Sequence, residues 1–182
     1  MKKYLKIFAI FTLLVLVLSG CHSKKASHEG YTLYRSSPVG VEIEYPSFWE
    51  MAEDKKKHRV AFATPNEGFA DNVRDNVTIL CEEIGTDELA FDNYVQNYLE
   101  QLPSSIAKYN HVSEQEMKVG ELEAYRVVYE GTTTEGDLRM QQTFIKSGKY
   151  MYIYTFMAEP SSYTYFEKNS NIMLSTFKAL KK

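Results

Sequence analysis

Three acidic side chains in one turn-rich segment, residues 64–75, have the chemistry to hold a cation. Glu67, Asp71 and Asp75 would supply carboxylate oxygens, the ligands that calcium takes in proteins. The EF-hand pattern fails, because counting from Asp71 places Val73 at the third position, where an oxygen ligand is needed. We therefore predict no regular metal site, and an irregular cation site at these three residues remains an alternative.

Four tyrosines on two expected strands form a second candidate site. They are Tyr125 and Tyr129 on one strand, and Tyr152 and Tyr154 on another. A tyrosine ring joins an apolar body to a polar hydroxyl, which suits contact with a sugar or a peptide. The alternative interpretation is that these rings are core residues beneath a helix.

No catalytic pattern accompanies these residues. The sequence has no G-x-S-x-G turn, no phosphate-binding P-loop, no H-E-x-x-H and no C-x-x-C. Its four histidines, at positions 22, 28, 58 and 111, have no ligand spacing. We therefore predict a protein that is not an enzyme and needs no cofactor. A hydrolase remains an alternative, because a pair of acids for general acid–base work is assembled in space and not in sequence.

The most specific chemistry lies near the N-terminus, at Leu18-Ser19-Gly20-Cys21. Three of the first six residues are lysine, and the apolar run 7–18 that follows is too short to span a membrane. The arrangement resembles the lipobox of bacterial lipoproteins, which implies cleavage between Gly20 and Cys21 and a diacylglycerol on the sulfur of Cys21. Two acyl chains, at about 0.8 kcal/mol per buried methylene, hold a protein on a membrane. We expect an anchor on the extracytoplasmic face of the cell membrane, and an uncleaved N-terminal anchor is the alternative.

The residues around this motif fit the same interpretation. Residues 22–30 are polar and predict a tether with a reach of about 30 Å. Lipidation of Cys21 would leave Cys81 without a disulfide partner. Cys81 shares one face of an expected strand with Val77 and Ile79, so we expect a small buried side chain and not a reactive thiol.

The charge balance excludes one class of partner. The chain has 21 basic and 24 acidic residues, and loss of three leader lysines changes the net charge from −3 to −6. Nucleic acid is therefore not expected as a partner, because neutralising phosphates requires an excess of Lys and Arg. One local exception is the charged run 53–59, which predicts an exposed hairpin tip. Its lysines could meet anionic lipid head groups, and a solvated turn is the alternative.

Hydrophobic periodicity predicts the elements that would position these side chains. Strands are expected at residues 31–35, 41–45, 60–63, 76–84, 111–119, 124–130, 138–146 and 150–157, and helices from 86 or 87 to 102 and from 161 or 162 to about 177. Residues 150–157 are apolar on both faces, which is typical of a strand in the middle of a covered sheet. In residues 41–45, Glu42 and Glu44 are expected to face solvent, and Pro103 is expected to end the first helix. The order predicts an α+β domain with a mostly antiparallel sheet and two main helices on opposite faces.

Five segments spread along the chain share a recognisable pattern. They are residues 40–49 (GVEIEYPSFW), Asn76, residues 120–129 (GELEAYRVVY), residues 148–155 (GKYMYIYT) and Ser175-Thr176-Phe177-Lys178. Together they resemble the PsbP-like (Mog1/PsbP, DcrB-like) domain family. The last segment departs from the Ser-Phe common in the family, which affects only the end of the second helix. The resemblance implies a three-layer α/β/α sandwich and accessory or binding work without catalysis, in a family that includes many bacterial lipoproteins.

These inferences divide the chain into a signal peptide (1–20), a lipidated cysteine with its tether (21–30) and a PsbP-like domain (31–182). We expect a membrane-tethered accessory protein whose partner is an unknown envelope protein or ligand. A small-ligand or cation-binding lipoprotein and a hydrolase are the alternatives.

Overall fold

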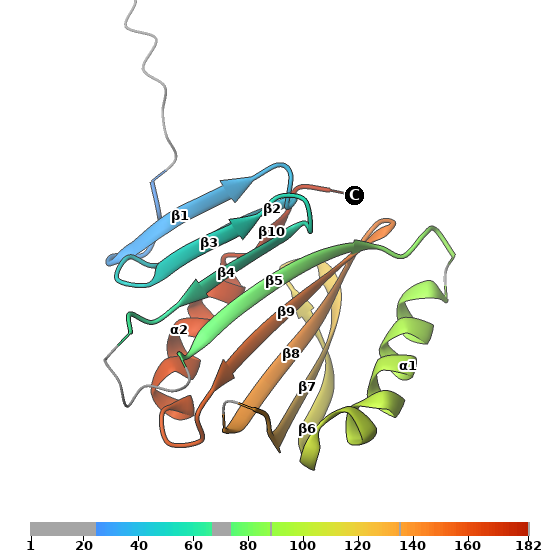
Figure 1. Ribbon diagram of the computed structural model, residues 1–182. Coiled ribbons are helices and arrows are strands. Elements are labelled where there is room, and N and C mark those ends of the chain that lie inside the picture. The colour runs from blue at the N-terminus through green and yellow to red at the C-terminus, as the bar shows by residue number, and fades with distance from the viewer. Residues whose placement is uncertain (1–24, 67–73, 88, 135, 182) are drawn as a thin grey trace, which may run out of the picture.

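Strand β9 (Tyr150–Ala158) lies at the centre of the structure, as its apolar sequence predicts. The computed structural model describes residues 25–66, 74–87, 89–134 and 136–181. In these ranges β9 is the fourth strand of a seven-stranded antiparallel sheet with the order β3-β4-β5-β9-β8-β7-β6 (Figure 1). It presents Tyr152, Tyr154 and Phe156 to a core on one face, and Met151 and Ile153 to a second core on the other.

The remaining strands of this sheet are β3 (Glu50–Asp54), β4 (Arg59–Ala63), β5 (Asn76–Glu83), β6 (Ala107–Val119), β7 (Leu122–Thr132) and β8 (Asp137–Ser147). Strand β3 was not predicted, because its residues show no apolar alternation and its last two belong to the charged run 53–59. The others agree with the expected segments, with shifted ends, and the largest shift is in β6, which begins four residues before the expected start at His111. The early part of β6 was not predicted, because nearly all its side chains are exposed and the residues do not alternate between apolar and polar.

A second, three-stranded antiparallel sheet was not predicted. It has the order β1-β2-β10 and is built from β1 (Tyr31–Ser36), β2 (Val41–Pro46) and β10 (Lys178–Ala179). Strand β10 begins just after the last helix, so the helix ends earlier than its apolar spacing suggests. Phe177, which has that spacing, is buried in the core from outside the helix.

Each face of the large sheet is covered by one helix. Helix α1 (Ala90–Ser105) covers one face, and α2 (Tyr163–Ser175) and the small sheet lie on the other side (Figure 1). The expected α+β sandwich with two helices and antiparallel sheets is confirmed. Pro103 does not end α1, which continues to Ser105. Pro103 removes one backbone hydrogen bond from the last turn, where the hydroxyls of Ser104 and Ser105 both donate to the carbonyl oxygen of Gln101.

Glu42 and Glu44 lie on the face of β2 opposite the core, as expected, but they are not exposed. Only 2% of Glu42 and 6% of Glu44 is accessible to solvent. Glu42 is held between Arg35, on β1, and Lys178, on β10. Lys178 is 136 residues away along the chain, on a strand that was not predicted, so alternation alone could not show this burial.

Glu44 binds the segment that precedes β1. Its Oε1 accepts hydrogen bonds from the backbone N–H and the hydroxyl of Ser27, at 2.6 and 2.8 Å. Its Oε2 lies 3.1 Å from the backbone N of His28 and 2.7 Å from its Nδ1. Burial alone would raise the pKa of Glu44, but these hydrogen bonds outweigh it and lower the pKa to about 2. Part of the expected tether is therefore fixed to the domain, and we call this contact the Glu44 clamp.

Substitution of Glu44 by glutamine tests the clamp through its pH dependence. The folded-state pKa lies below the ordinary value of 4.5, so the clamp stabilises the fold fully above pH 4.5 and loses its effect as pH falls through 2. We expect Glu44→Gln to lower the free energy of unfolding by about 1–2 kcal/mol at pH 7, and the difference to vanish near the folded-state pKa. Urea unfolding followed by circular dichroism measures both. Glu121→Gln, at an exposed turn, is the control. A Glu44→Gln protein as stable as the parent at pH 7 would contradict the prediction.

Candidate functional site

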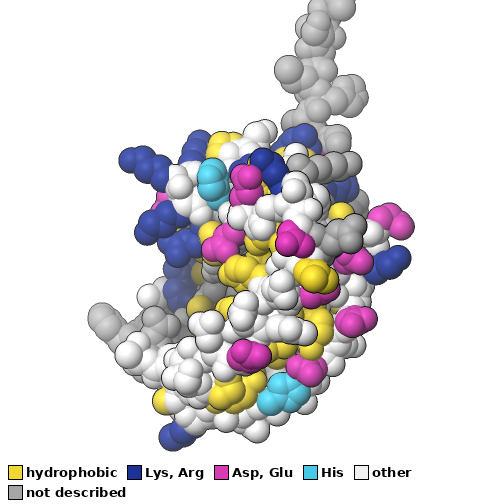
Figure 2. All heavy atoms as spheres, turned by 90° about the vertical axis from the view of Figure 1, so that its right-hand side faces the viewer, with side chains coloured by type: hydrophobic (Ala, Val, Ile, Leu, Met, Phe, Trp, Pro, Cys, Tyr) yellow, Lys and Arg dark blue, Asp and Glu magenta, His cyan; other side chains and the backbone are white. Residues whose placement is uncertain are grey.

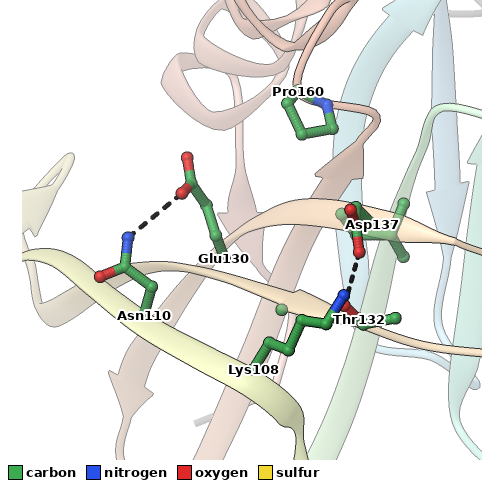
Figure 3. Close-up of a pocket in the computed structure, with 8 residues that line it drawn as sticks. Lys108, Asn110, Glu130, Thr132, Asp137 and Pro160 are labelled. Carbon is green, nitrogen blue, oxygen red and sulfur yellow. Dashed lines mark hydrogen bonds between the residues drawn. The ribbon is translucent and has the colours of Figure 1, made fainter.

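A polar pocket of about 230 Å³ lies at one end of the large sheet, where β6 and β8 begin and β7 ends. Its lining residues are Lys108, Asn110, Glu130, Gly131, Thr132, Asp137, Leu138 and Pro160. Pro160 comes from the connection between β9 and α2 (Figure 3). Four segments that are distant along the chain thus contribute to one concave surface, as is usual for ligand sites.

A β-bulge on the edge strand β6 places Lys108 at this pocket. Ala107 pairs with Thr132 and Asn110 pairs with Glu130, so β6 has one more residue than β7 between these pairs. Lys108 takes up that extra residue with a left-handed backbone, at φ 51°. Such a conformation costs a non-glycine residue about 1–3 kcal/mol, so the surrounding structure must enforce it. Bulges of this kind redirect a side chain, here that of a lysine beside the pocket.

The other polar side chains at the pocket bind one another. The amide nitrogen of Asn110 donates to Oε2 of Glu130 at 3.2 Å, and Nη1 of Arg139 lies 3.7 Å from Oε1 of Glu130. The hydroxyl of Thr132 donates to Asp137 (Figure 3). In that view the Lys108 side chain extends toward this Thr132–Asp137 pair. Within the described part of the chain, Lys108 has no carboxylate at ion-pairing distance.

This arrangement has the groups to bind a charged ligand. The pocket combines an ammonium group with two carboxylates, an amide and a hydroxyl, which together can recognise charged and hydrogen-bonding groups. None of its lining residues is a serine, cysteine or histidine. Its one hydroxyl, on Thr132, faces an aspartate and no lysine or histidine base, so the described residues show no activated nucleophile.

The four tyrosines predicted as a binding face do not form one, and this expectation is corrected. Tyr152 and Tyr154 point to the core beneath α2, whereas Tyr125 and Tyr129 point to the core beneath α1. Tyr129, Tyr152 and Tyr154 are at most 2% exposed, and burial raises their pKa values. Their hydroxyls are used internally: that of Tyr154 reaches Ser170 on α2, and that of Tyr129 donates to Gln142. The alternative, that these rings are core, is confirmed for the three buried tyrosines, and only Tyr125 is partly exposed.

Of the three candidate cation ligands, the structure describes Asp75 alone. Oδ1 of Asp75 accepts hydrogen bonds from the backbone N–H of Glu159 at 3.2 Å and from the hydroxyl of Ser162 at 2.8 Å. Asp75 is 7% exposed. Its two hydrogen bonds hold the segment that leads into α2, so its carboxylate has a structural role. Glu67 and Asp71 lie outside the described residues, so the alternative of an irregular cation site at these three residues is not tested. Among the described residues, no group of three His, Cys, Asp or Glu side chains could hold a metal ion.

The predictions for the two cysteines have different outcomes. Cys81 is 4% exposed in the same core as Val77 and Ile79, and burial raises the pKa of its thiol, so the prediction of a small buried side chain is confirmed. Gly20 and Cys21 lie outside the described residues, and lipidation stays a prediction. In the charged run 53–59, residues 55–59 are exposed at the turn between β3 and β4 and at the start of β4, as expected, whereas Glu53 and Asp54 are half-buried at the end of β3.

Sequence reasoning missed the pocket. Its turn, residues 131–137, stands out as polar, but the bulge at Lys108 has no signal in the residue pattern. Gly131 gives a retrospective clue, because a Cβ atom there would come within 2.1 Å of Cγ2 of Ile106.

Gly131→Ala tests whether this close approach supports the pocket. The added methyl group must push Ile106 and the start of β6 away, so we expect a loss of about 1–3 kcal/mol in the free energy of unfolding, measured by urea denaturation. The double variant Gly131→Ala, Ile106→Ala removes the clashing atom. A double variant that recovers no part of the loss, relative to Ile106→Ala alone, would show that steric overlap is not the cause.

Comparison with known proteins adds a family and a set of structural neighbours. No curated protein matches the sequence significantly. The solved structure of CyanoP from Synechocystis sp. PCC 6803 aligns with a TM-score of 0.63 at 11% identity, covering 89% of this chain and 98% of CyanoP. LpqN from Mycobacterium tuberculosis gives 0.62 at 9%, covering 81% and 89%. PA94 from Pseudomonas aeruginosa, a protein of unknown function, gives 0.57 at 19%, covering 80% and 94%.

At these identities the structural likeness concerns the fold alone. Neither described helix is both long and apolar enough to cross a membrane.

The sequence model of the PsbP-like protein family matches residues 20–179, nearly the whole chain. This chain therefore belongs to the PsbP-like protein family.

Proposed function

We propose that this protein is an extracytoplasmic lipoprotein that acts as a non-catalytic accessory protein and binds a component of the cell envelope. The support for the anchor is the sequence around Cys21, with its basic start, short apolar run and small residues before the cysteine. A diacylglycerol on Cys21 would hold the protein at the outer surface of the cell membrane.

The observation that carries the binding role is the pocket around Lys108. It lies where β8 begins, whereas the other end of β8, at Ser147, contacts the C-terminal segment through Lys181. Ten residues of extended chain separate these ends by about 33 Å. The described part of the chain begins beside the small sheet, in the upper part of Figure 1, whereas β6 begins and β7 ends in its lower part, where the pocket lies. An anchored domain would thus hold its pocket away from its attachment point.

The relatives support an envelope role in general terms. LpqN is described as involved in cell envelope biogenesis. Resemblance to the PsbP-like family favours accessory work over catalysis, and the pocket lacks an activated nucleophile within the described chain. Fold likeness alone cannot assign the partner, so the pocket chemistry must identify it.

A second candidate function is the binding of a small polar ligand. The pocket volume of about 230 Å³ favours it, because a small molecule with charged groups would fit between Lys108 and the carboxylates of Glu130 and Asp137. A partner protein would instead insert a polar side chain at the same place.

Replacement of Cys21 by serine tests the anchor. We expect the variant to lose the mass of the diacylglycerol and to move from the detergent phase to the aqueous phase in Triton X-114 partitioning, because no acyl chain remains. Mass spectrometry and immunoblotting give the two readouts. Ser23→Ala, close by in the expected tether, is the matched control. Unchanged mass and partitioning of Cys21→Ser would overturn the proposed anchor.

Reversal of the Lys108 charge tests the binding site. The lipidated protein is used to capture partners from native membranes, and bound proteins and small molecules are identified by mass spectrometry. We expect Lys108→Glu to reduce capture at least tenfold, since a charge-assisted contact is replaced by repulsion. Lys118→Glu, exposed near the other end of the same strand, should retain capture. Equal capture by both variants would exclude the pocket as the binding site.

A further inference from the structure

We propose that a second surface, at the end of the molecule opposite the pocket, docks on anionic lipid head groups and sets the orientation of the domain on the membrane. This inference rests on the proposed anchor at Cys21 and goes beyond it, because a lipid anchor alone leaves the domain free to rotate.

The surface is formed where three segments meet. Nδ1 of His58, in the β3–β4 turn, lies 2.8 Å from the carbonyl oxygen of Pro38, in the β1–β2 turn. The backbone N–H of Leu180 donates to the carbonyl oxygen of Gly40 at 2.8 Å, which joins the C-terminal segment to the same turn. The two turns and the C-terminal segment therefore form one continuous edge.

Basic side chains dominate this edge, which we call the basic edge. Its members are Arg35, Lys55, Lys56, Lys57, Arg59, Lys178 and Lys181. The acidic side chains in the same segments are Glu42, Glu53 and Asp54. Seven basic groups thus face three acidic ones, in a chain whose overall charge is −3. Figure 2 shows most of the Lys and Arg side chains of that face gathered in its upper part.

The acidic groups of the edge are buried or half-buried, whereas most of its basic groups are exposed. Glu42 is 2% exposed between Arg35 and Lys178, which are themselves 53% and 66% exposed. Asp54 accepts a hydrogen bond from the backbone N–H of Lys57 at 3.2 Å. Lys55, Lys56, Lys57 and Arg59 are exposed, and within the described ranges no carboxylate is at ion-pairing distance from them.

The Glu44 clamp brings the expected lipid anchor to the basic edge. Glu42 and Glu44 share one face of β2 and lie two residues, or about 7 Å, apart along the strand. Ser27, which binds Glu44, is thereby held on the same face of the small sheet as the Arg35–Glu42–Lys178 cluster. From Cys21 to Ser27 there are six residues, which extend to about 20 Å at most. The clamp therefore shortens the free tether, and the anchor holds the basic edge close to the membrane surface.

The charge of the basic edge and its short distance from the membrane together indicate anionic lipid as what it binds. An anionic membrane surface attracts each nearby lysine or arginine by an amount that corresponds to roughly a fivefold change in occupancy. The attraction fades beyond a Debye length of about 8–10 Å, so it acts only on a surface held close to the lipid. The basic edge meets both conditions, and the acidic remainder of the chain is repelled from the same membrane.

A fluorescent probe on the edge tests the docking. The lipidated full chain carrying Ser37→Cys, in the β1–β2 turn, is labelled with an environment-sensitive dye, while Cys81 stays unlabelled because it is buried. The protein is reconstituted in vesicles of phosphatidylcholine alone, or with added phosphatidylglycerol. We expect the emission of the dye to shift to the blue only in vesicles that contain phosphatidylglycerol, and high salt should reverse this shift. The same dye on Thr134→Cys, near the pocket, should not respond.

Charge removal completes the test. The double variant Lys56→Gln, Lys57→Gln should lower the ratio of docked to free protein by roughly 25-fold. Lys118→Gln with Lys168→Gln, which removes two exposed lysines elsewhere, should leave it unchanged. Protein that floats with both vesicle types but shows no phosphatidylglycerol-dependent shift, or whose shift survives the edge substitutions, overturns the docking surface. Protein that floats with neither vesicle type overturns the anchor itself.

Discussion

A strand that is apolar on both faces has to be covered from both sides, and the rest of this structure follows from that requirement. β9 buries tyrosines and a phenylalanine toward one core and a methionine and an isoleucine toward the other. Each core needs its own covering element, because a sheet face of this composition cannot remain in water. Helix α1 supplies one cover, and α2 with the small sheet supplies the other. The pocket lies at one end of the long strands, and the basic edge lies at the other end of the molecule, on two turns and the C-terminal segment.

The sequence was most informative where one local pattern decides the outcome. The central place of β9, the apolar face of α1 and the buried Cys81 follow from spacing alone, because the burial of apolar surface is the largest driving force for folding. It was least informative where a distant partner decides. Glu42 and Glu44 have the positions of solvent-facing residues, yet Lys178 and His28 cover them from 136 and 16 residues away. Strand β10 is only two residues long, too short for any periodic signal.

The candidate sites show the same contrast between features set by a local pattern and features set by distant residues. Alternation tells which tyrosines share a face within one strand, but not which face of the sheet that is. Tyr125 and Tyr154 were therefore grouped together although the sheet separates them. The pocket depends on the added residue in β6 and on the backbone conformation of Lys108, and neither has a signature in residue type. The basic run 53–59 was visible, but its union with Arg35, Lys178 and Lys181 exists only in the folded chain.

The Glu44 clamp also has a mechanical consequence. Force that the proposed lipid anchor would transmit along the chain would reach Ser27 and His28 before it reaches β1. Tension between membrane and domain would therefore first pull these residues from Glu44, and the released chain up to Tyr31 would lengthen the link by at most about 13 Å while both sheets stay paired. With that anchor in place, the clamp would let the domain yield to a pull without unfolding and return to its position when the load is removed.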